Sequence, residues 1–374
     1  MKSGSRSFDA PVQRARRDLV AAGETLREWL TTRLSFTDLA IHGVTTPAGA
    51  GVANETLLAD AEWRESGRVR TGGFAVRVAV DDPLYRDADI SVQYKMYQAL
   101  ADEPGIPVPA VYGYEPDPTV LGAPFFVMER ISGEVPADLP YYTESGFVVD
   151  ATPAQRRRLW LDAVEVLCRV NQVRTEKVPF LFRPHDGASG LEQDLAYWQR
   201  YYIWAARGRE HPTLDPAAEW LSANVPDDRP TSLAWGDARV CNMIFRDFRC
   251  VSILDWDGVS LCGGESDLAW WCVMEHGGGK RPTLPGLGSY DELVDMWEER
   301  TGLHAANLRY HIAYALFRLG AILLKLNDQM VATGHLPADA DIATNSEVVQ
   351  QLAELLDLPA PGRIETTLPP LRRL

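Results

Sequence analysis

The sequence has few of the features that mark several common protein classes. Its 374 residues include five cysteines, and no two of them form a Cys-x-x-Cys pair. An odd number without paired spacing indicates neither a disulfide framework nor a zinc site. The chain also has no Gly-x4-Gly-Lys loop and no His-Glu-x-x-His motif. Their absence excludes two familiar routes to phosphate binding and zinc catalysis.

Long apolar runs and a basic surface are missing as well. The longest apolar stretch, 312–324, is interrupted by Arg318, which rules out a simple membrane span. The first residues have no apolar core, so we expect no signal peptide and a cytoplasmic location. A formal net charge of −15 argues against nucleic acid or an anionic membrane as a partner. The sequence leaves the oligomeric state open.

What the sequence does contain is a short stretch with three oxygen-bearing side chains at defined spacing. Asn242 follows Asp237 by five positions, and Asp255 stands at the end of a second apolar run after a short polar turn. Two such runs joined by a turn are typical of a β-hairpin, which would bring Asp255 back beside Asn242. Amide and carboxylate oxygens suit a hard cation such as Mg²⁺. A base at Asp237 and two metal ligands are what phosphoryl transfer requires.

This stretch resembles the catalytic segment of the aminoglycoside phosphotransferase family, the small-molecule relatives of protein kinases. The family's His-Gly-Asp, its Asn five residues later and its Ile-Asp-Trp-Glu-like segment correspond to 235–237, Asn242 and 254–257. Trp235 stands where the family has His, a residue that supports the loop, so neither the base nor a ligand is lost. The plainer alternative is a common Gly-Asp turn and a strand that ends in Leu-Asp-Trp.

The resemblance implies a fold and a reaction. The fold is α+β and protein-kinase-like, with a small antiparallel sheet lobe and a mainly helical lobe. The reaction is transfer of the ATP γ-phosphate to a hydroxyl of a small molecule, with Asp237 as the base and Mg²⁺ held by Asn242 and Asp255. Asp257 would add a contact behind these ligands or to a second metal, and Asp267 would brace the catalytic loop.

The first part of the chain resembles the family's nucleotide-covering sheet less closely. Gly51, Asn54 and Thr56 match a Gly-x-Ser-Asn-x-Thr phosphate loop, although Ala53 stands where Ser is usual. A later strand of the family carries a phosphate-binding Lys, and the basic residue of the corresponding strand here is Arg77. Because Arg can bind phosphate bidentately, Arg77 is the predicted replacement. An ordinary exposed strand Arg is the alternative.

Two further positions follow from the resemblance. The helix expected at about 89–101 should supply an acid that orients the basic residue, but the matching position holds the neutral Gln93. The segment from Glu129 to Ile131 falls where related kinases join their lobes and hold adenine through backbone groups. Glu129 and Ile131 are therefore the predicted contacts to the base of the nucleotide.

Hydrophobic spacing and the resemblance together predict the organisation of the chain. Apolar residues at helical spacing predict helices over 10–34, 305–327 and 338–356. We expect three parts: an N-terminal helical segment over 1–36, a sheet lobe over 37–131, and a catalytic and acceptor-binding lobe over 132–374.

The acceptor cannot be identified from the sequence, but its class can be narrowed. The segments expected on the acceptor side, 139–147, 197–204 and 270–276, are rich in aromatic residues and contain two acids, Glu144 and Glu275. A polycationic sugar needs a carboxylate for each desolvated ammonium group. We therefore expect a flat or apolar alcohol rather than an aminoglycoside. The alternative is that these rings form core and the pocket is acidic.

Two other functions stay open at this point. The first is the same fold acting on 4-hydroxyacyl-CoA thioesters. The second, from a different class, is a nucleotide-binding pseudokinase, which Trp235, Arg77 and Gln93 favour and the intact Asp237, Asn242 and Asp255 oppose.

Overall fold

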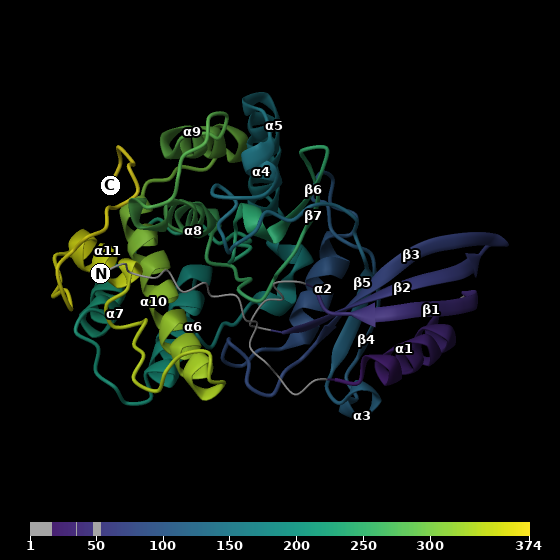
Figure 1. The fold of residues 1–374 in the computed structure, drawn as a ribbon. Coiled ribbons are helices and arrows are strands. Elements are labelled where there is room, and N and C mark those ends of the chain that lie inside the picture. The colour runs from purple at the N-terminus through teal and green to yellow at the C-terminus, as the bar shows by residue number, and fades with distance from the viewer. Residues whose placement is uncertain (1–16, 35, 48–53) are drawn as a thin grey trace, which may run out of the picture.

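The computed structural model describes residues 17–34, 36–47 and 54–374, arranged as a sheet lobe beside a larger helical lobe (Figure 1). The sheet has five antiparallel strands in the order β1-β2-β3-β5-β4. These are β1 (Thr37–Thr45), β2 (Glu55–Glu65), β3 (Arg68–Val78), β4 (Val111–Glu115) and β5 (Phe125–Glu129). The predicted division into an antiparallel sheet lobe and a mainly helical lobe is confirmed.

Helices cover both faces of this sheet. Alternation along β5 points Phe125 and Val127 into the core under α1 (Leu19–Arg33), and points Phe126 and Met128 into the core shared with α2 (Ile90–Leu100). A short helix, α3 (Pro118–Leu121), connects β4 to β5. Helices therefore pack on both faces of the sheet, and this packing fixes the positions of the residues near the ends of β2 and β3.

The helical lobe is built around one long central helix. This helix, α10 (Leu308–Ala332), packs against α6, α7, α8 and α11. Within the described part of the chain, no helix combines the length and hydrophobicity that crossing a bilayer needs. The other elements of the lobe are α4 (Phe147–Asp150), α5 (Pro153–Asn171), α6 (Gly190–Ala206), α7 (Leu214–Ala223), β6 (Met243–Arg246), β7 (Arg249–Ile253), α8 (Gly264–His276), α9 (Tyr290–Thr301) and α11 (Glu347–Leu356).

The structure differs from the predicted elements in two places, and the described residues cover a third prediction only in part. The helix predicted over 338–356 is wrong at 338–346, which forms turns, because the Asp341 side chain accepts the backbone N–H groups of Ala343 and Thr344 (3.2 and 2.8 Å). Such bonds compete with helix formation, and the helix begins only at Glu347. Strand β1 was not predicted. The first helix begins at Leu19, and residues 10–16 of that prediction lie outside the described residues.

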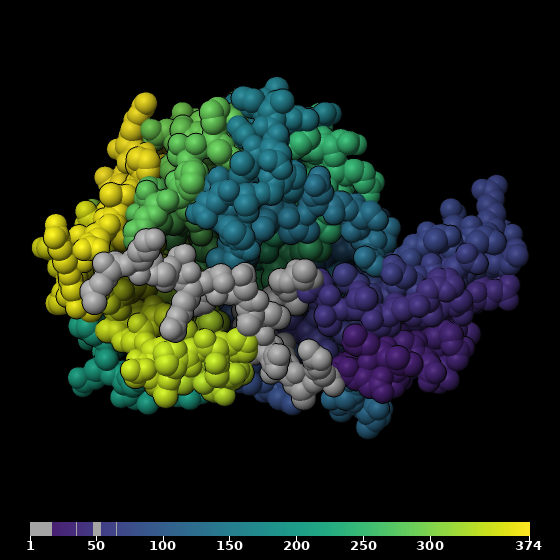
Figure 2. Space-filling model, in the orientation of Figure 1, coloured from purple at the N-terminus to yellow at the C-terminus, as the bar shows by residue number. Residues whose placement is uncertain are grey.

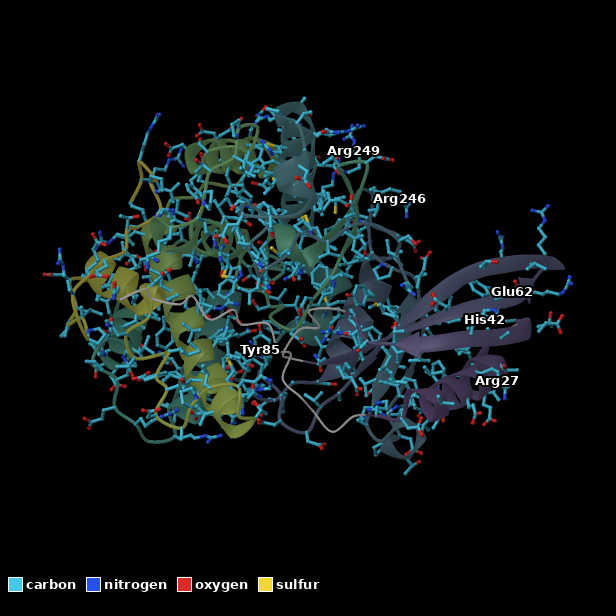
Figure 3. All side chains as sticks on the ribbon, viewed as in Figure 1. Arg27, His42, Glu62, Tyr85, Arg246 and Arg249 are labelled. Carbon is cyan, nitrogen blue, oxygen red and sulfur yellow. The ribbon has the colours of Figure 1, made fainter. Side chains whose placement is uncertain are left out.

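The two lobes are joined by the connection between β3 and α2 as well as by the chain after β5. The hydroxyl of Tyr201 on α6 donates to the carbonyl of Leu84 (2.8 Å), and Lys325 on α10 pairs with Asp82. Figure 3 shows Tyr85 of this connection between the lobes, and Figure 2 shows the sheet lobe projecting from the side of the helical lobe. These contacts attach the β3–α2 connection of the sheet lobe to α6 and α10 of the helical lobe.

Candidate active site

The predicted catalytic loop, residues 235–242, is held at its backbone by a buried carboxylate from α8. Asp267 accepts the backbone N–H groups of Trp235 (2.7 Å) and Gly236 (2.8 Å), and the amide of Asn171 (2.8 Å). Gly236 has φ +93°, and a Cβ there would lie 1.9 Å from the carbonyl oxygen of Gly258. Only glycine fits this position, so the loop leads into Asp237 through a turn that no other residue can make.

Asp237 is held by three donors and is nearly buried, with 13 % of its side chain exposed. Its Oδ1 accepts the indole N–H of Trp270 (2.7 Å), its Oδ2 accepts Nδ2 of Asn242 (2.7 Å), and Arg239 lies 3.0 Å away. A carboxylate offers about four acceptor positions. Three donors therefore fix the orientation of Asp237 and leave about one acceptor position without a protein donor.

The hairpin brings the two predicted metal ligands to adjacent backbone positions. Met243 pairs with Ile253 across the ladder, and the N–H of Leu254 donates to the carbonyl of Asn242 (2.9 Å). Asp255 follows directly and has φ +64°, in the left-handed region. Asp adopts this conformation more readily than most non-glycine residues.

Trp235 stands where the resemblance has His, and it links the loop of Asp237 to the segment of Asp255. Its indole N–H donates to the carbonyls of Leu254 (2.9 Å) and Asp255 (3.0 Å), and the side chain is fully buried. Its ring also lies 5.8 Å from that of Trp256. The substitution thus keeps a donor that links the loop of Asp237 to the segment of Asp255.

The predicted phosphate-side residues meet at Asp257. Nδ2 of Asn54 donates to both carboxylate oxygens (3.1 and 2.9 Å), Arg77 pairs with Oδ2 (3.4 Å), and Nε2 of Gln93 donates to Oδ1. Arg77 also donates to the hydroxyl of Thr56 (3.0 Å). Burial and the nearby Asp255 carboxylate raise the pKa of Asp257, and Arg77 opposes this shift.

The remaining predicted nucleotide contacts are Gly51, Glu129 and Ile131. Gly51 lies outside the described residues. Glu129 ends β5 and is exposed, and its N–H donates to the carbonyl of Ala110 (2.7 Å). Ile131 follows at the junction of the lobes and is half-buried. Neither is brought into contact with the catalytic loop.

Sequence reasoning missed Trp270 and Arg318. Trp270 follows Asp267 by three positions on α8, so both side chains face the loop, and this spacing could have identified it. Arg318 is 2 % exposed, donates to the carbonyl of Gly236 (3.0 Å) and lies 4.6 Å from the Trp270 ring centre. Arg318 interrupts the apolar stretch 312–324. Because burying a charge is costly, a buried charge within such a stretch indicates a structural or functional role.

The donor set fits a magnesium ion better than a metal held by protein alone. The described residues contain no group of three or more His, Cys, Asp or Glu side chains placed to bind a metal. Because Nδ2 of Asn242 is directed at Asp237, its Oδ1 faces the other way. One amide oxygen and the Asp255 carboxylate suit Mg²⁺, which keeps several waters and substrate phosphates as ligands.

The chain around the segments predicted for the acceptor side packs against the loop of Asp237. Cys241 of the loop donates to the carbonyl of Ala137 (3.6 Å), and burial raises the pKa of its thiol, so it is a packed residue and not a nucleophile. The aromatic rings of the predicted segments are mostly core. Those at most 5 % exposed are Tyr141, Tyr142, Trp198, Tyr201, Tyr202, Trp270 and Trp271.

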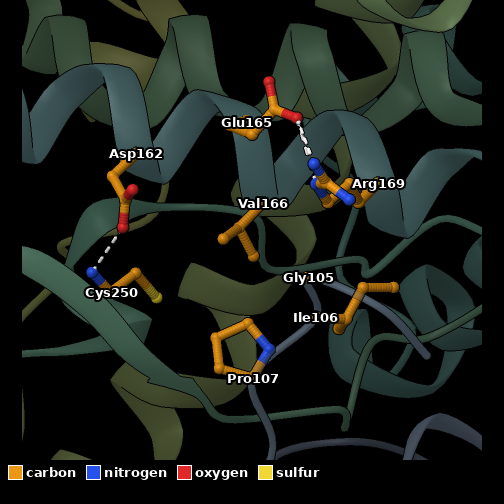
Figure 4. A pocket seen from close by; sticks show the side chains of 8 residues that line it. All are labelled: Gly105, Ile106, Pro107, Asp162, Glu165, Val166, Arg169 and Cys250. Carbon is orange, nitrogen blue, oxygen red and sulfur yellow. Dashed lines mark hydrogen bonds and ion pairs between the residues drawn. The ribbon is translucent and has the colours of Figure 1, made fainter. Parts of the chain in front are cut away.

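A pocket of about 400 Å³ lies away from this site (Figure 4). It is lined by 105–107, one face of α5, and Cys250 of β7. Asp162 of α5 accepts the N–H of Cys250 (2.7 Å) there. None of the predicted catalytic or phosphate-side residues lines it, so it is distinct from the candidate active site.

Comparison with solved structures identifies the fold. A Ralstonia eutropha protein assigned to the aminoglycoside phosphotransferases superposes with a TM-score of 0.63 at 21 % identity, covering 89 % of this chain and 95 % of that one. A macrolide 2′-phosphotransferase from Brachybacterium faecium gives 0.53 at 16 % identity over 86 % and 98 %. A Plasmodium vivax ethanolamine kinase gives 0.53 at 12 % identity over 87 % and 85 %. The fold is kinase-like.

The family follows from the sequence comparison. Residues 46–303 match the model of the phosphotransferase enzyme family, and the chain belongs to that family. The aminoglycoside phosphotransferase resemblance is thereby confirmed, and the protein is a phosphotransferase.

Curated relatives carry a different name. The acyl-CoA dehydrogenase family member 11 of Pongo abelii is 26 % identical over 82 % of this chain, and family member 10 of Mus musculus is 26 % identical over 71 %. The chain spans 41 % and 25 % of these relatives. It therefore matches less than half of the length of either one.

Proposed function

We propose that the protein transfers the γ-phosphate of ATP to a hydroxyl of a small molecule in a magnesium-dependent reaction. The observation that carries this proposal is the position of Asp237. Trp270, Asn242 and Arg239 orient its carboxylate and leave one acceptor position for the proton of the hydroxyl. This is the geometry that a general base for an alcohol needs.

The other residues have separate tasks in this proposal. Asn242 and Asp255 would hold Mg²⁺, which would supply positive charge beside the transferred phosphate. Arg77 and Asn54 lie on the phosphate side, and the backbone at Glu129 and Ile131 contacts adenine. The bonds that Trp235 and Arg77 make favour an active enzyme over a pseudokinase, since both substitutions keep donors in place.

Asp255→Ala should remove most of the stabilisation that magnesium adds. Wild-type protein with ATP should melt at a higher temperature as Mg²⁺ is titrated, because a ligand bound only to the folded state stabilises it. Asp255→Ala should show a much smaller shift in thermal melting. Asp247→Ala, at the far turn of the same hairpin, is the matched control and should behave as wild type. An unchanged shift in Asp255→Ala places the metal elsewhere.

The charges near the loop disfavour a polycationic acceptor. Asp138 is paired with Arg239, and one carboxylate oxygen of Glu275 accepts a bond from Tyr142, so these acids are partly engaged. Arg281 adds positive charge, with its guanidinium 3.5 Å from the Tyr141 ring centre. An ammonium-rich sugar would meet the guanidinium groups of Arg239 and Arg281 here, whereas these cations would favour an acceptor with phosphate or carboxylate groups.

A 4-hydroxyacyl-CoA thioester is therefore the second candidate acceptor. It combines an apolar chain and a hydroxyl with the phosphates of CoA, and the names of the relatives point to acyl-CoA chemistry.

The test is phosphate transfer from labelled ATP to 4-hydroxyacyl-CoA, to aromatic alcohols and to kanamycin under equal conditions. We expect turnover of an anionic or apolar alcohol and little with kanamycin. A specificity constant for kanamycin of roughly 10⁴ M⁻¹ s⁻¹ or higher overturns this acceptor class. No transfer to any acceptor, with Asp237 intact, favours the pseudokinase.

A further inference from the structure

Asp257 is contacted by three side chains that all come from the other lobe. Asn54 precedes β2, Arg77 lies on β3 and Gln93 lies on α2, whereas Asp257 follows the catalytic hairpin. Asn54 and Gln93 are 4 % and 1 % exposed. A carboxylate of one lobe that accepts bonds from a loop, a strand and a helix of the other lobe cannot keep them if the lobes separate.

The charges of Arg77 and Asp257 indicate which residue replaces the helix acid. The side chains of Arg77 and Asp257 are 12 % and 8 % exposed, and a buried guanidinium without a partner is strongly destabilising. In kinases the basic residue of this strand is paired with an acid on the following helix. Here that helix presents Gln93, which is neutral and donates its amide N–H to Asp257. The acid therefore comes from the catalytic lobe.

We propose that Asp257 is a positioning residue that replaces the helix acid, holding Arg77 toward the nucleotide phosphates and closing the sheet lobe onto the catalytic lobe. The kinetic part of this inference rests on the proposed phosphotransfer, and the lobe-closing part does not. Nucleotide binding and lobe closure are thereby coupled through one carboxylate. The Michaelis constant for ATP should depend on Asp257 more strongly than the turnover number does.

The first test is a double-mutant cycle on ATP binding. Asp257→Asn and Arg77→Met should each weaken Mg·ATP binding by about 10-fold, and the double variant should be little weaker than either, because residues in one ion pair are not additive. Binding is measured by isothermal titration calorimetry in the absence of acceptor, so no turnover is needed. Asp38→Asn on β1 breaks the exposed ion pair of Asp38 with Arg64 on β2 and is the matched control, with expected wild-type affinity.

The second test moves the negative charge of Asp257 to position 93 on α2. In Asp257→Asn, the further change Gln93→Glu reverses donor and acceptor across the same hydrogen bond and restores one negative charge near Arg77. The pair Gln93→Glu with Asp257→Asn should recover most of the lost ATP affinity. Gln93→Glu alone should weaken binding, because it places two carboxylates together in a buried site.

The third test addresses closure without nucleotide. Amide hydrogen exchange should accelerate in β3 and α2 of Asp257→Asn and remain unchanged in α9, which lies in the other lobe. Additive effects of Asp257→Asn and Arg77→Met, or unchanged exchange in β3 and α2, overturn the proposal. A higher Mg²⁺ requirement with additive effects identifies Asp257 as a metal ligand instead. If no acceptor is phosphorylated, the binding and exchange tests still decide the role of Asp257, so the two proposals fail separately.

Discussion

Asp237→Asn should lower the turnover number by about 10² to 10⁴-fold, the range for losing a general base. The substitution keeps the shape of the side chain and one acceptor oxygen, so the bond from Trp270 or from Asn242 can persist. It removes the carboxylate that takes the proton of the attacking hydroxyl. The measurement is steady-state transfer of phosphate from ATP to the best acceptor found.

Two controls separate chemistry from folding in this experiment. The ATP affinity and melting temperature of Asp237→Asn should stay near wild type, since the nucleotide-side contacts converge on Asp257. Asp291→Asn makes the same chemical change in an ion pair with Arg372, outside the catalytic segment, and should retain full turnover. Turnover of Asp237→Asn within a few-fold of wild type contradicts the assignment of the base.

Asp267→Ala should cost the protein about 3 kcal/mol or more of unfolding free energy, because each buried donor left unpaired costs about 1–3 kcal/mol. The donors released are the N–H groups of Trp235 and Gly236 and the side-chain amide of Asn171. Asp267 is 1 % exposed, so bulk water does not reach these groups in the folded protein.

The loss is measured as the shift of the urea midpoint, followed by tryptophan fluorescence. Asp339→Ala removes an exposed acid from a turn and should shift the midpoint little. If Asp267→Ala unfolds at the wild-type urea concentration, the catalytic loop does not depend on this carboxylate for its conformation.

The catalytic segment shows how much local sequence determines. The hairpin around 243–253, the five-residue step from Asp237 to Asn242 and the position of Asp255 all follow from short-range spacing. Backbone geometry converts such spacing into structure with little help from the rest of the chain. The family resemblance, carried by these same residues, supplied the two-lobe fold. Strand β1 and the turns at 338–346 were not read correctly, since pairing partners and side-chain caps decided them.

Only the tertiary structure determined which side chains contact Asp237 and Asp257. Asp257 lies 203 residues from Asn54 and 164 from Gln93, and no local pattern connects them. Trp270 reaches Asp237 across 33 residues, and Trp235 reaches the carbonyls of 254 and 255 through an indole that occupies the place of an imidazole. A sequence names the polar groups that must be satisfied when buried, but their partners are set only when the lobes pack and exclude water.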